Sequence, residues 1–165
     1  MTQTAVILDN LRSVYNVASI FRTSDALGIN KIYLAGITPT PTDKYGRPRS
    51  DFVKVALGAE KKIPWEYSAD TKACILNLKK EGFYIVAIEQ DEKSVDYKKV
   101  NLPDSAKGSD GARKVAFLIG TETMGIPKEI LDLADVIAEI PMKGDKESLN
   151  VTIAFGIAAF RILDL

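Results

Sequence analysis

Asn16, Ser19 and Arg22 form the first group of polar residues whose spacing suits a binding or catalytic site. They lie three residues apart, so on a helix they form one polar arc. In an open α/β sheet, ligands bind where strands end and the next helices begin, and this arc follows the first apolar run of the chain. A solvated helix face with Ser13 as its N-cap is the simpler explanation of the arc taken alone.

The second group is the loop from Gly120 to Gly125, which follows an apolar run at 115–119. Its outline is that of a dinucleotide-binding loop, but Glu122 stands where the middle glycine would be, and its negative charge would repel a pyrophosphate. A carboxylate there suits a cationic or hydroxyl-bearing ligand, or a donor on another loop, and the glycines let the backbone fold around a small molecule. The alternative is a tight turn with an exposed Glu before a helix whose first position is Pro127.

The third group lies in the loop 140–151, where a segment from Ser148 to Leu163 begins that is apolar on nearly all sides. A helix of this kind must be buried on more than one side, in a deep core or at a subunit interface. The simplest interpretation makes Ser148 its N-cap and places Asn150 at the second or third helical position. Because an unpaired buried amide costs roughly 1–3 kcal/mol, Asn150 needs a partner, which makes this loop a candidate site.

Alternating apolar runs and amphipathic segments must position these groups. The expected strands are 5–8, 31–34, 83–88, 115–119 and 136–140. Their nearly continuous apolar character is typical of parallel strands covered on both faces. Between them, one helix starts near Val14 and stops at Gly28, and another spans 73–80 and stops at Gly82. The sequence therefore predicts a single α/β domain over 1–165 with a parallel sheet.

Histidine is absent from the 165 residues, and Cys74 is the only cysteine. Nucleophilic systems that need an imidazole, thiolate zinc sites and an intrachain disulfide are therefore excluded, and we expect no metal. The 22 Lys and Arg residues balance the 22 Asp and Glu residues, so a nucleic-acid partner would have to be held by a local patch. Because we find neither signal-peptide features nor an apolar run long enough to span a membrane, we expect a cytoplasmic protein with no membrane partner.

The segment 36–50 is long and irregular for a connection inside a compact domain. Residues 43–62 hold six Lys or Arg and three Asp or Glu, a local charge of +3, with Tyr45 and Phe52 interleaved. Cations for phosphates and aromatic rings for bases are what a single-stranded nucleic-acid contact uses, and a solvated charged loop explains the pattern equally well. The candidate phosphate contacts are Lys44, Arg47 and Arg49.

The three groups also occur in a recognisable order. The motifs are Asn16 and Arg22 in Asn-Val-Ala-Ser-Ile-Phe-Arg, then Gly120-Thr121-Glu122-Thr123-Met124-Gly125, then Ile140-Pro141-Met142 followed by Ser148-Leu149-Asn150-Val151. Any one motif is weak, but all three in sequence cover nearly the whole chain. In these motifs the sequence resembles the SpoU/TrmH family of RNA ribose 2′-O-methyltransferases, which belongs to the SPOUT superfamily.

The resemblance implies a parallel-sheet SPOUT fold with helices on both faces and a C-terminal trefoil knot, a rare exception to the rule against threaded loops. It also implies a homodimer with the last and the opening helices near the interface. The implied cofactor is S-adenosylmethionine (S-adenosyl-L-methionine), bound by the backbone of the knotted loops, with Leu149 packed against it. The residues implied in cofactor binding are Ile88, Glu89, Gly120, Gly125, Ile140, Met142, Ser148 and Leu149.

The implied activity is methyl transfer to the ribose 2′-hydroxyl of tRNA or rRNA. The implied catalytic residues are Arg22, Asn16, Glu122, Ser148 and Asn150, and the implied RNA-binding residues are Arg22, Lys44, Arg47 and Arg49. A guanidinium is effectively never deprotonated, so we expect Arg22 to hold an RNA phosphate and stabilise the developing alkoxide rather than accept the proton. Typical relatives carry an additional RNA-binding domain. We expect none in this chain, so RNA recognition would come from the catalytic domain, the dimer or a partner protein.

Three other functions compete with this one. A SPOUT-type enzyme could methylate an RNA base instead of a ribose, although the pair Asn16 and Arg22 and the run Ser148-Leu149-Asn150 favour the ribose. The same fold could serve as a non-catalytic RNA-binding or assembly module, although its motif residues are intact. A flavodoxin-like or dinucleotide-binding domain fits the alternation of strands and helices but lacks a phosphate loop.

Overall fold

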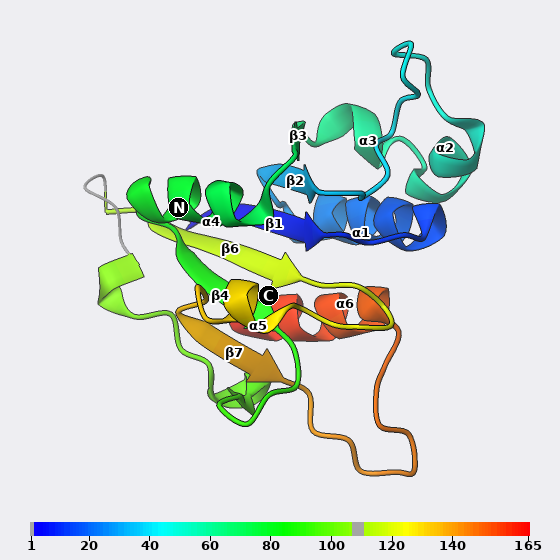
Figure 1. The fold of residues 1–165 in the computed structure, drawn as a ribbon. Coiled ribbons are helices and arrows are strands. Elements are labelled where there is room, and N and C mark those ends of the chain that lie inside the picture. The colour runs from blue at the N-terminus through cyan, green and yellow to red at the C-terminus, as the bar shows by residue number, and fades with distance from the viewer. Residues whose placement is uncertain (1, 107–110) are drawn as a thin grey trace.

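A computed structural model of the protein describes residues 2–106 and 111–165. Within these residues, seven strands form one sheet in the order β3-β2-β1-β6-β4-β7-β5, and every neighbouring pair is parallel. The strands are β1 (Thr2–Asp9), β2 (Lys31–Ala35), β3 (Trp65–Ser68), β4 (Tyr84–Ile88), β5 (Val95–Asp96), β6 (Arg113–Ile119) and β7 (Val136–Glu139). The predicted parallel sheet is confirmed, and all its strands point toward the same edge (Figure 1).

Helices cover both faces of the sheet, as predicted. They are α1 (Val14–Leu27), α2 (Ser50–Ala56), α3 (Ala59–Lys62), α4 (Thr71–Lys80), α5 (Lys128–Leu131) and α6 (Val151–Ile162), with short 3-10 turns η1 (Tyr97–Lys99) and η2 (Asp104–Ala106). Helices α1, α2 and α6 lie on one face, and α4 and α5 lie on the other (Figure 1). No helix in the described part of the chain combines the length and the apolar character needed to cross a bilayer.

The alternation of side chains along the central strands divides the core in two. On β1, Val6 and Leu8 join the cluster under α1 and α6, whereas Ala5 and Ile7 join the cluster under α4 and α5. Because consecutive side chains of a strand point to opposite faces, a strand with helices on both sides must be apolar throughout. This explains why the central strands are visible in the sequence as unbroken apolar runs.

Two strands, β3 and β5, are not among those predicted from the sequence. Strand β5 has two residues, and β3 has four that are half-buried or exposed. Both lie at the outer edges of the sheet, where a strand has a neighbour on one side only and buries few side chains. Neither strand therefore has in its sequence the continuous apolar run that marks the central strands.

The start of α6 differs from the expectation. Asn150 is its N-cap, and the Asn150 side chain accepts a hydrogen bond from the backbone N–H of Thr152 at 2.9 Å. Ser148 therefore lies in the preceding loop, and Asn150 is not inside the first turn. Similarly, Pro127 is the N-cap of α5 and not its first residue. The predicted cap of α1 by Ser13 is confirmed, and the trefoil knot stays a prediction.

Candidate active site

A cavity of about 590 Å³ lies at the carboxyl edge of the sheet, where β4, β6 and β7 end. Its walls come from residues 88–91, 120–126, 138–140 and 148–151, together with Asn16 of α1, Lys128, Leu131, Met142 and Ala154. The strands are parallel and their carboxyl ends meet at one edge, so loops far apart in sequence converge there. Its volume lies in the range of small-molecule sites.

The loop 120–126 can take its shape only with glycine at two positions. A Cβ on Gly120 would lie 2.5 Å from the Ile126 side chain and 2.7 Å from the backbone of Gly125. Gly125 has a φ of 67°, and a Cβ there would lie 2.6 Å from a Glu89 carboxylate oxygen. The loop backbone therefore approaches itself and the Glu89 carboxylate more closely than a residue with a Cβ would permit.

Glu89 connects three of the loops that form the cavity. Its Oε2 accepts a hydrogen bond from the Ile126 N–H at 3.0 Å, and its Oε1 accepts one from the Gln90 N–H at 2.9 Å. Gln90 Nε2 in turn donates to the Glu147 carbonyl at 2.8 Å. The end of β4 thus holds both the glycine loop and the loop before α6, a role for which the sequence carries no motif.

The structure brings together three of the predicted catalytic residues. Asn16 Nδ2 donates to Glu122 Oε1 at 2.9 Å, and Asn150 Nδ2 donates to Asn16 Oδ1 at 3.4 Å. Asn150 Oδ1 is used in capping α6. The buried Asn16 amide is thereby held in one orientation between a carboxylate and a second amide. The burial expected of Asn150 is wrong, because this residue is exposed at the start of α6, although its amide does find a partner in Asn16.

Glu122 is a carboxylate at neutral pH. Partial burial raises its pKa, but hydrogen bonds donated by the Asn16 side chain and by the backbone N–H groups of Glu122 itself, Arg12 and Ser13 outweigh this effect. The pKa of Glu122 therefore lies below its ordinary value of 4.5. A fixed negative charge is what orients the Asn16 amide, because the carboxylate accepts from its N–H₂ side.

The cavity is acidic. Its lining includes four carboxylates, Glu89, Asp91, Glu122 and Glu139, and a single Lys128. The Lys128 ammonium lies 3.5 Å from the Asp91 carboxylate, so its charge is already partnered. An excess of negative charge favours a ligand that carries positive charge.

The eight residues predicted to bind the cofactor all line this cavity, and so do four of the five predicted catalytic residues. Arg22 is the exception. It lies exposed on α1, six residues beyond Asn16, outside the cavity wall. Sequence reasoning missed Gln90 and Asp91, which lie directly after a strand end but outside any motif.

Three of the four predicted RNA-binding cations, Lys44, Arg47 and Arg49, lie on the connection between β2 and α2, which is at the same edge of the sheet as the cavity (Figure 1). Arg47 pairs with Asp43 at 2.9 Å, and Arg49 pairs with Asp51 at 3.0 Å. Lys44 makes no ion pair within residues 2–106 and 111–165.

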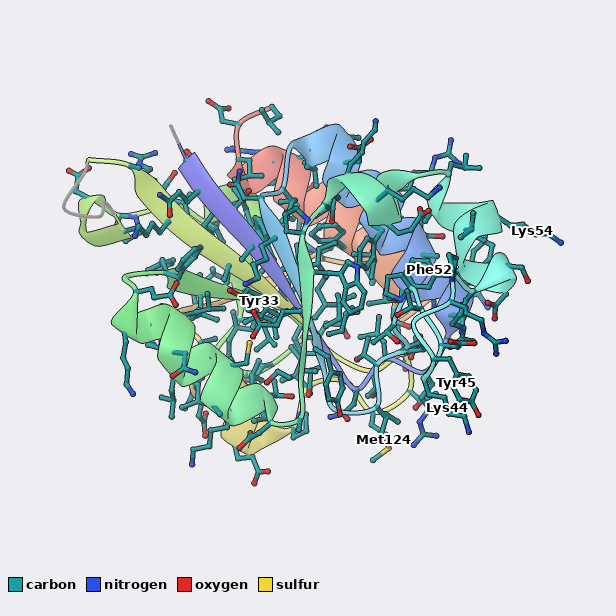
Figure 2. The ribbon with its side chains drawn as sticks, turned by 90° about the horizontal axis from the view of Figure 1, so that it is seen from above. Tyr33, Lys44, Tyr45, Phe52, Lys54 and Met124 are labelled. Carbon is teal, nitrogen blue, oxygen red and sulfur yellow. The ribbon has the colours of Figure 1, made fainter. Side chains whose placement is uncertain are left out.

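The expectation that two aromatic rings serve this loop is wrong for Phe52. Its ring is fully buried and packs edge-on against Phe21, with 5.3 Å between ring centroids. Phe52 lies on the inner side of α2, where it joins the main core. Tyr45 is the aromatic ring of the pair that projects outward (Figure 2).

Comparison with known proteins gives matches over nearly the whole chain. The 23S rRNA (guanosine-2′-O-)-methyltransferase RlmB of Neisseria meningitidis is 29% identical over 152 residues, which are 92% of this chain and 54% of that protein. The tRNA (guanosine(18)-2′-O)-methyltransferase of Thermus thermophilus is 30% identical over 155 residues, which are 94% of this chain and 71% of that protein. The chain thus spans about half the length of the first relative.

A solved structure has the same fold. The crystal structure of AdoMet-bound rRNA methyltransferase from Sinorhizobium meliloti superposes with a TM-score of 0.81 and 32% identity, over 97% of this chain and 55% of that one. The predicted SPOUT fold is thereby confirmed. The sequence model of the SpoU rRNA methylase family matches residues 3–160. Because this match covers nearly the full sequence, including all three motifs, the chain belongs to the SpoU rRNA methylase family.

Proposed function

We propose that this chain transfers a methyl group from S-adenosylmethionine to a ribose 2′-hydroxyl of tRNA or rRNA. The observation that carries the proposal is the hydrogen-bonded group of Asn16, Glu122 and Asn150 at the wall of the acidic cavity. The two relatives named above are guanosine-2′-O-methyltransferases of rRNA and of tRNA, which supports this reaction and these RNA classes. With such substrates we expect the protein in the cytoplasm.

The cavity fits S-adenosylmethionine in size and charge. This cofactor carries a sulfonium and an ammonium group, and four carboxylates line the cavity. Gly120 and Gly125 let the loop pack tightly against Ile126 and Glu89, which gives this wall of the cavity its shape. We propose that the cofactor is held by Ile88, Glu89, Gly120, Gly125, Ile140, Met142, Ser148 and Leu149. When bound, it supplies an electrophilic methyl group.

The polar residues of the chain have the task of placing the ribose. Transfer to an oxygen needs that oxygen aligned with the methyl group, so positioning is the largest contribution. The amide of Asn16 is fixed by Glu122 and Asn150, which lets it present a constant hydrogen-bonding pattern to the substrate. Ser148, in the loop before α6, adds a hydroxyl at the cavity wall.

Arg22 acts from outside the cavity. Arg22 is exposed on α1, so its guanidinium is free to meet an RNA strand. A permanent cation there holds an RNA phosphate and stabilises the negative charge that develops on the ribose oxygen. Lys44, Arg47 and Arg49, on the connection between β2 and α2, would supply further contacts to phosphates.

We also propose a homodimer that uses the outward face of α6. Ile153 is 53% exposed, and Ile157 and Phe160 are each 39% exposed. The prediction that this helix is buried on more than one side therefore needs a second copy to cover that face. Sedimentation should show a dimer for the wild type and a monomer for Ile157→Lys, and a monomeric wild type would contradict the proposal.

The test of the proposed activity is transfer of tritiated methyl from S-adenosylmethionine to unmodified tRNA and, separately, rRNA. Cofactor binding is measured beside it by calorimetry. We expect both binding and label in one of the two RNAs. Binding of the cofactor without transfer to either RNA contradicts the proposed substrates. Absence of cofactor binding contradicts the proposal that the protein is a methyltransferase.

A further inference from the structure

Residues 42–48 form a small hairpin that is held by its own side chains. Thr42 and Pro48 form an antiparallel bridge, and Gly46, with a φ of 77°, makes the turn. Asp43 Oδ1 accepts hydrogen bonds from the N–H groups of Tyr45 at 2.8 Å and Arg47 at 3.0 Å. Asp43 Oδ2 accepts a third from Arg47 Nε at 2.9 Å. These bonds fix the backbone on both sides of Tyr45.

Tyr45 stands at the tip of this hairpin with its ring in solvent. The side chain is 69% exposed, although a ring of this size gains free energy from burial. The Lys44 ammonium and the Arg47 guanidinium each lie 5.0 Å from the ring centroid. Because most of the ring is still exposed beside these two cations, open ring surface remains for a flat partner.

The two cations have different freedom. Arg47 is held by its ion pair and hydrogen bond with Asp43, so its guanidinium stays beside the ring. Lys44 makes no ion pair in the described part of the chain, and its ammonium is on a flexible stem. Lys44 can therefore leave the ring for a phosphate, while Arg47 keeps the hairpin in shape.

The hairpin lies at the edge of the sheet where the cavity opens. It follows β2, and in a parallel sheet the segments that follow strands lie at the edge where the cavity opens (Figure 1). Seen from above, Lys44 and Tyr45 project at the same side of the molecule as Met124 of the glycine loop (Figure 2). One RNA strand can therefore pass from the hairpin to the cavity along a single edge.

We propose that Tyr45 stacks on an unpaired nucleobase of the RNA substrate while Lys44 holds an adjacent phosphate. This inference rests on the proposed function and adds to it that the RNA is single-stranded beside the modified nucleotide. Stacking of a base on an aromatic ring tolerates any of the four bases, because each has a flat π-face. The hairpin is thus a contact for an unpaired base and not a reader of base sequence.

The test compares two fluorescent probes of about ten nucleotides, within the usual site size for single strands. One is oligouridylate, and the other is an abasic ribose-phosphate chain with the same number of phosphates. Binding is followed by fluorescence anisotropy with the full chain. The variants are Tyr45→Ala and Tyr45→Phe, with Tyr67→Ala as a matched control, because Tyr67 is 52% exposed on the edge strand β3.

We expect the wild type, Tyr45→Phe and Tyr67→Ala to bind the base-bearing probe roughly 5-fold or more above the abasic one, as expected for one stacked base. Tyr45→Ala should bind both probes alike. Lys44→Ala should weaken both probes to the same extent, because each contains the phosphate. A wild type that does not prefer the base-bearing probe, or a Tyr45→Ala variant that keeps the full preference, overturns the inference.

The outcome is separate from that of the proposed function. Methyl transfer by the wild type without any preference for the base-bearing probe overturns the stacking contact alone. A clear preference without methyl transfer to tRNA or rRNA leaves the contact standing and contradicts the proposed activity. The melting temperature of Tyr45→Ala should match that of the wild type, because the exposed ring contributes little to the core.

Discussion

The cavity and the hairpin 42–48 lie along one edge of the sheet, but their contacts span very different lengths of chain. In the cavity wall, Asn16 bonds to Glu122 across 106 residues, and Asn150 bonds to Asn16 across 134. In the hairpin, the contacts of Asp43 reach two and four residues along the chain. The cavity forms only when the whole sheet is assembled, whereas the conformation of the hairpin is determined by contacts within residues 42–48.

This difference predicts how each region fails. A change in the cavity should reach other segments, because Glu89 joins the end of β4 to the glycine loop. A change in the hairpin should stay local and affect RNA alone. Arg22, on the exposed side of α1 and outside the cavity wall, should affect the reaction without affecting the cofactor.

The largest effect is expected for Arg22→Ala. Methyl transfer should fall by about 10²- to 10³-fold, the usual cost of removing one group that stabilises a developing oxyanion. The affinity for S-adenosylmethionine should stay within about twofold of the wild type, because Arg22 is outside the cavity. Arg113→Ala, an exposed arginine at the opposite end of β6, is the matched control and should keep full activity. Equal activity of the two variants would contradict the role of Arg22.

The next effect is expected for Gly120→Ala. The added Cβ meets the Gly125 backbone and Ile126, and relieving such overpacking costs roughly 1–3 kcal/mol. The glycine loop must shift, so the affinity for S-adenosylmethionine measured by calorimetry should fall about tenfold or more. Gly144→Ala is the control, because a Cβ there meets nothing within 4 Å. A normal affinity in Gly120→Ala would mean that the loop is not part of the cofactor site.

A smaller effect, with a defined pH dependence, is expected for Glu122→Gln. The hydrogen bonds that lower the pKa of Glu122 stabilise the folded protein above the unfolded-state pKa, and this contribution is lost as the pH falls through the folded-state pKa. The melting temperature of the wild type should therefore be higher than that of Glu122→Gln at pH 7. The difference between the two melting temperatures should shrink below about pH 4. A difference that does not change between these two conditions would show that the charge of Glu122 has no part in it.

The smallest effect tests whether changes in the cavity spread. Burial raises the pKa of the Cys74 thiol to about 12, so iodoacetamide should react slowly with the folded protein at pH 8 and quickly in urea. Cys74 shares the core under α4 and α5 with Ile126. Gly120→Ala, which pushes against Ile126, should speed the reaction a few-fold, while Tyr45→Ala should leave it unchanged. A faster reaction in Tyr45→Ala than in Gly120→Ala would contradict the claim that changes spread from the cavity but not from the hairpin.

The parts of the fold that could be predicted are those whose burial is repeated along the chain. The run 115–119 is apolar at every position because both faces of β6 are covered, and α1 has a cap at Ser13 and a stop at Gly28. The choice of Asn150 over Ser148 as the cap of α6 depends on the path of the loop before it, which local sequence does not specify.

The candidate site shows the same division. Its motif residues were visible because glycines and polar residues interrupt apolar runs. The bond from the Ile126 N–H to Glu89 left no signal, since it joins a backbone group to a side chain 37 residues away. Phe52 was misplaced because an aromatic residue among cations has the same appearance whether its ring faces the core or the solvent.

The most direct test of the central claim is nucleoside mass spectrometry of RNA after reaction with the wild-type protein and S-adenosylmethionine. We predict that the RNA gains a nucleoside with the methyl group on the ribose 2′-oxygen and that its bases stay unmodified. A methyl group on a base would contradict the assignment of Asn16, Arg22 and Glu122 to a ribose hydroxyl, even if transfer itself were efficient.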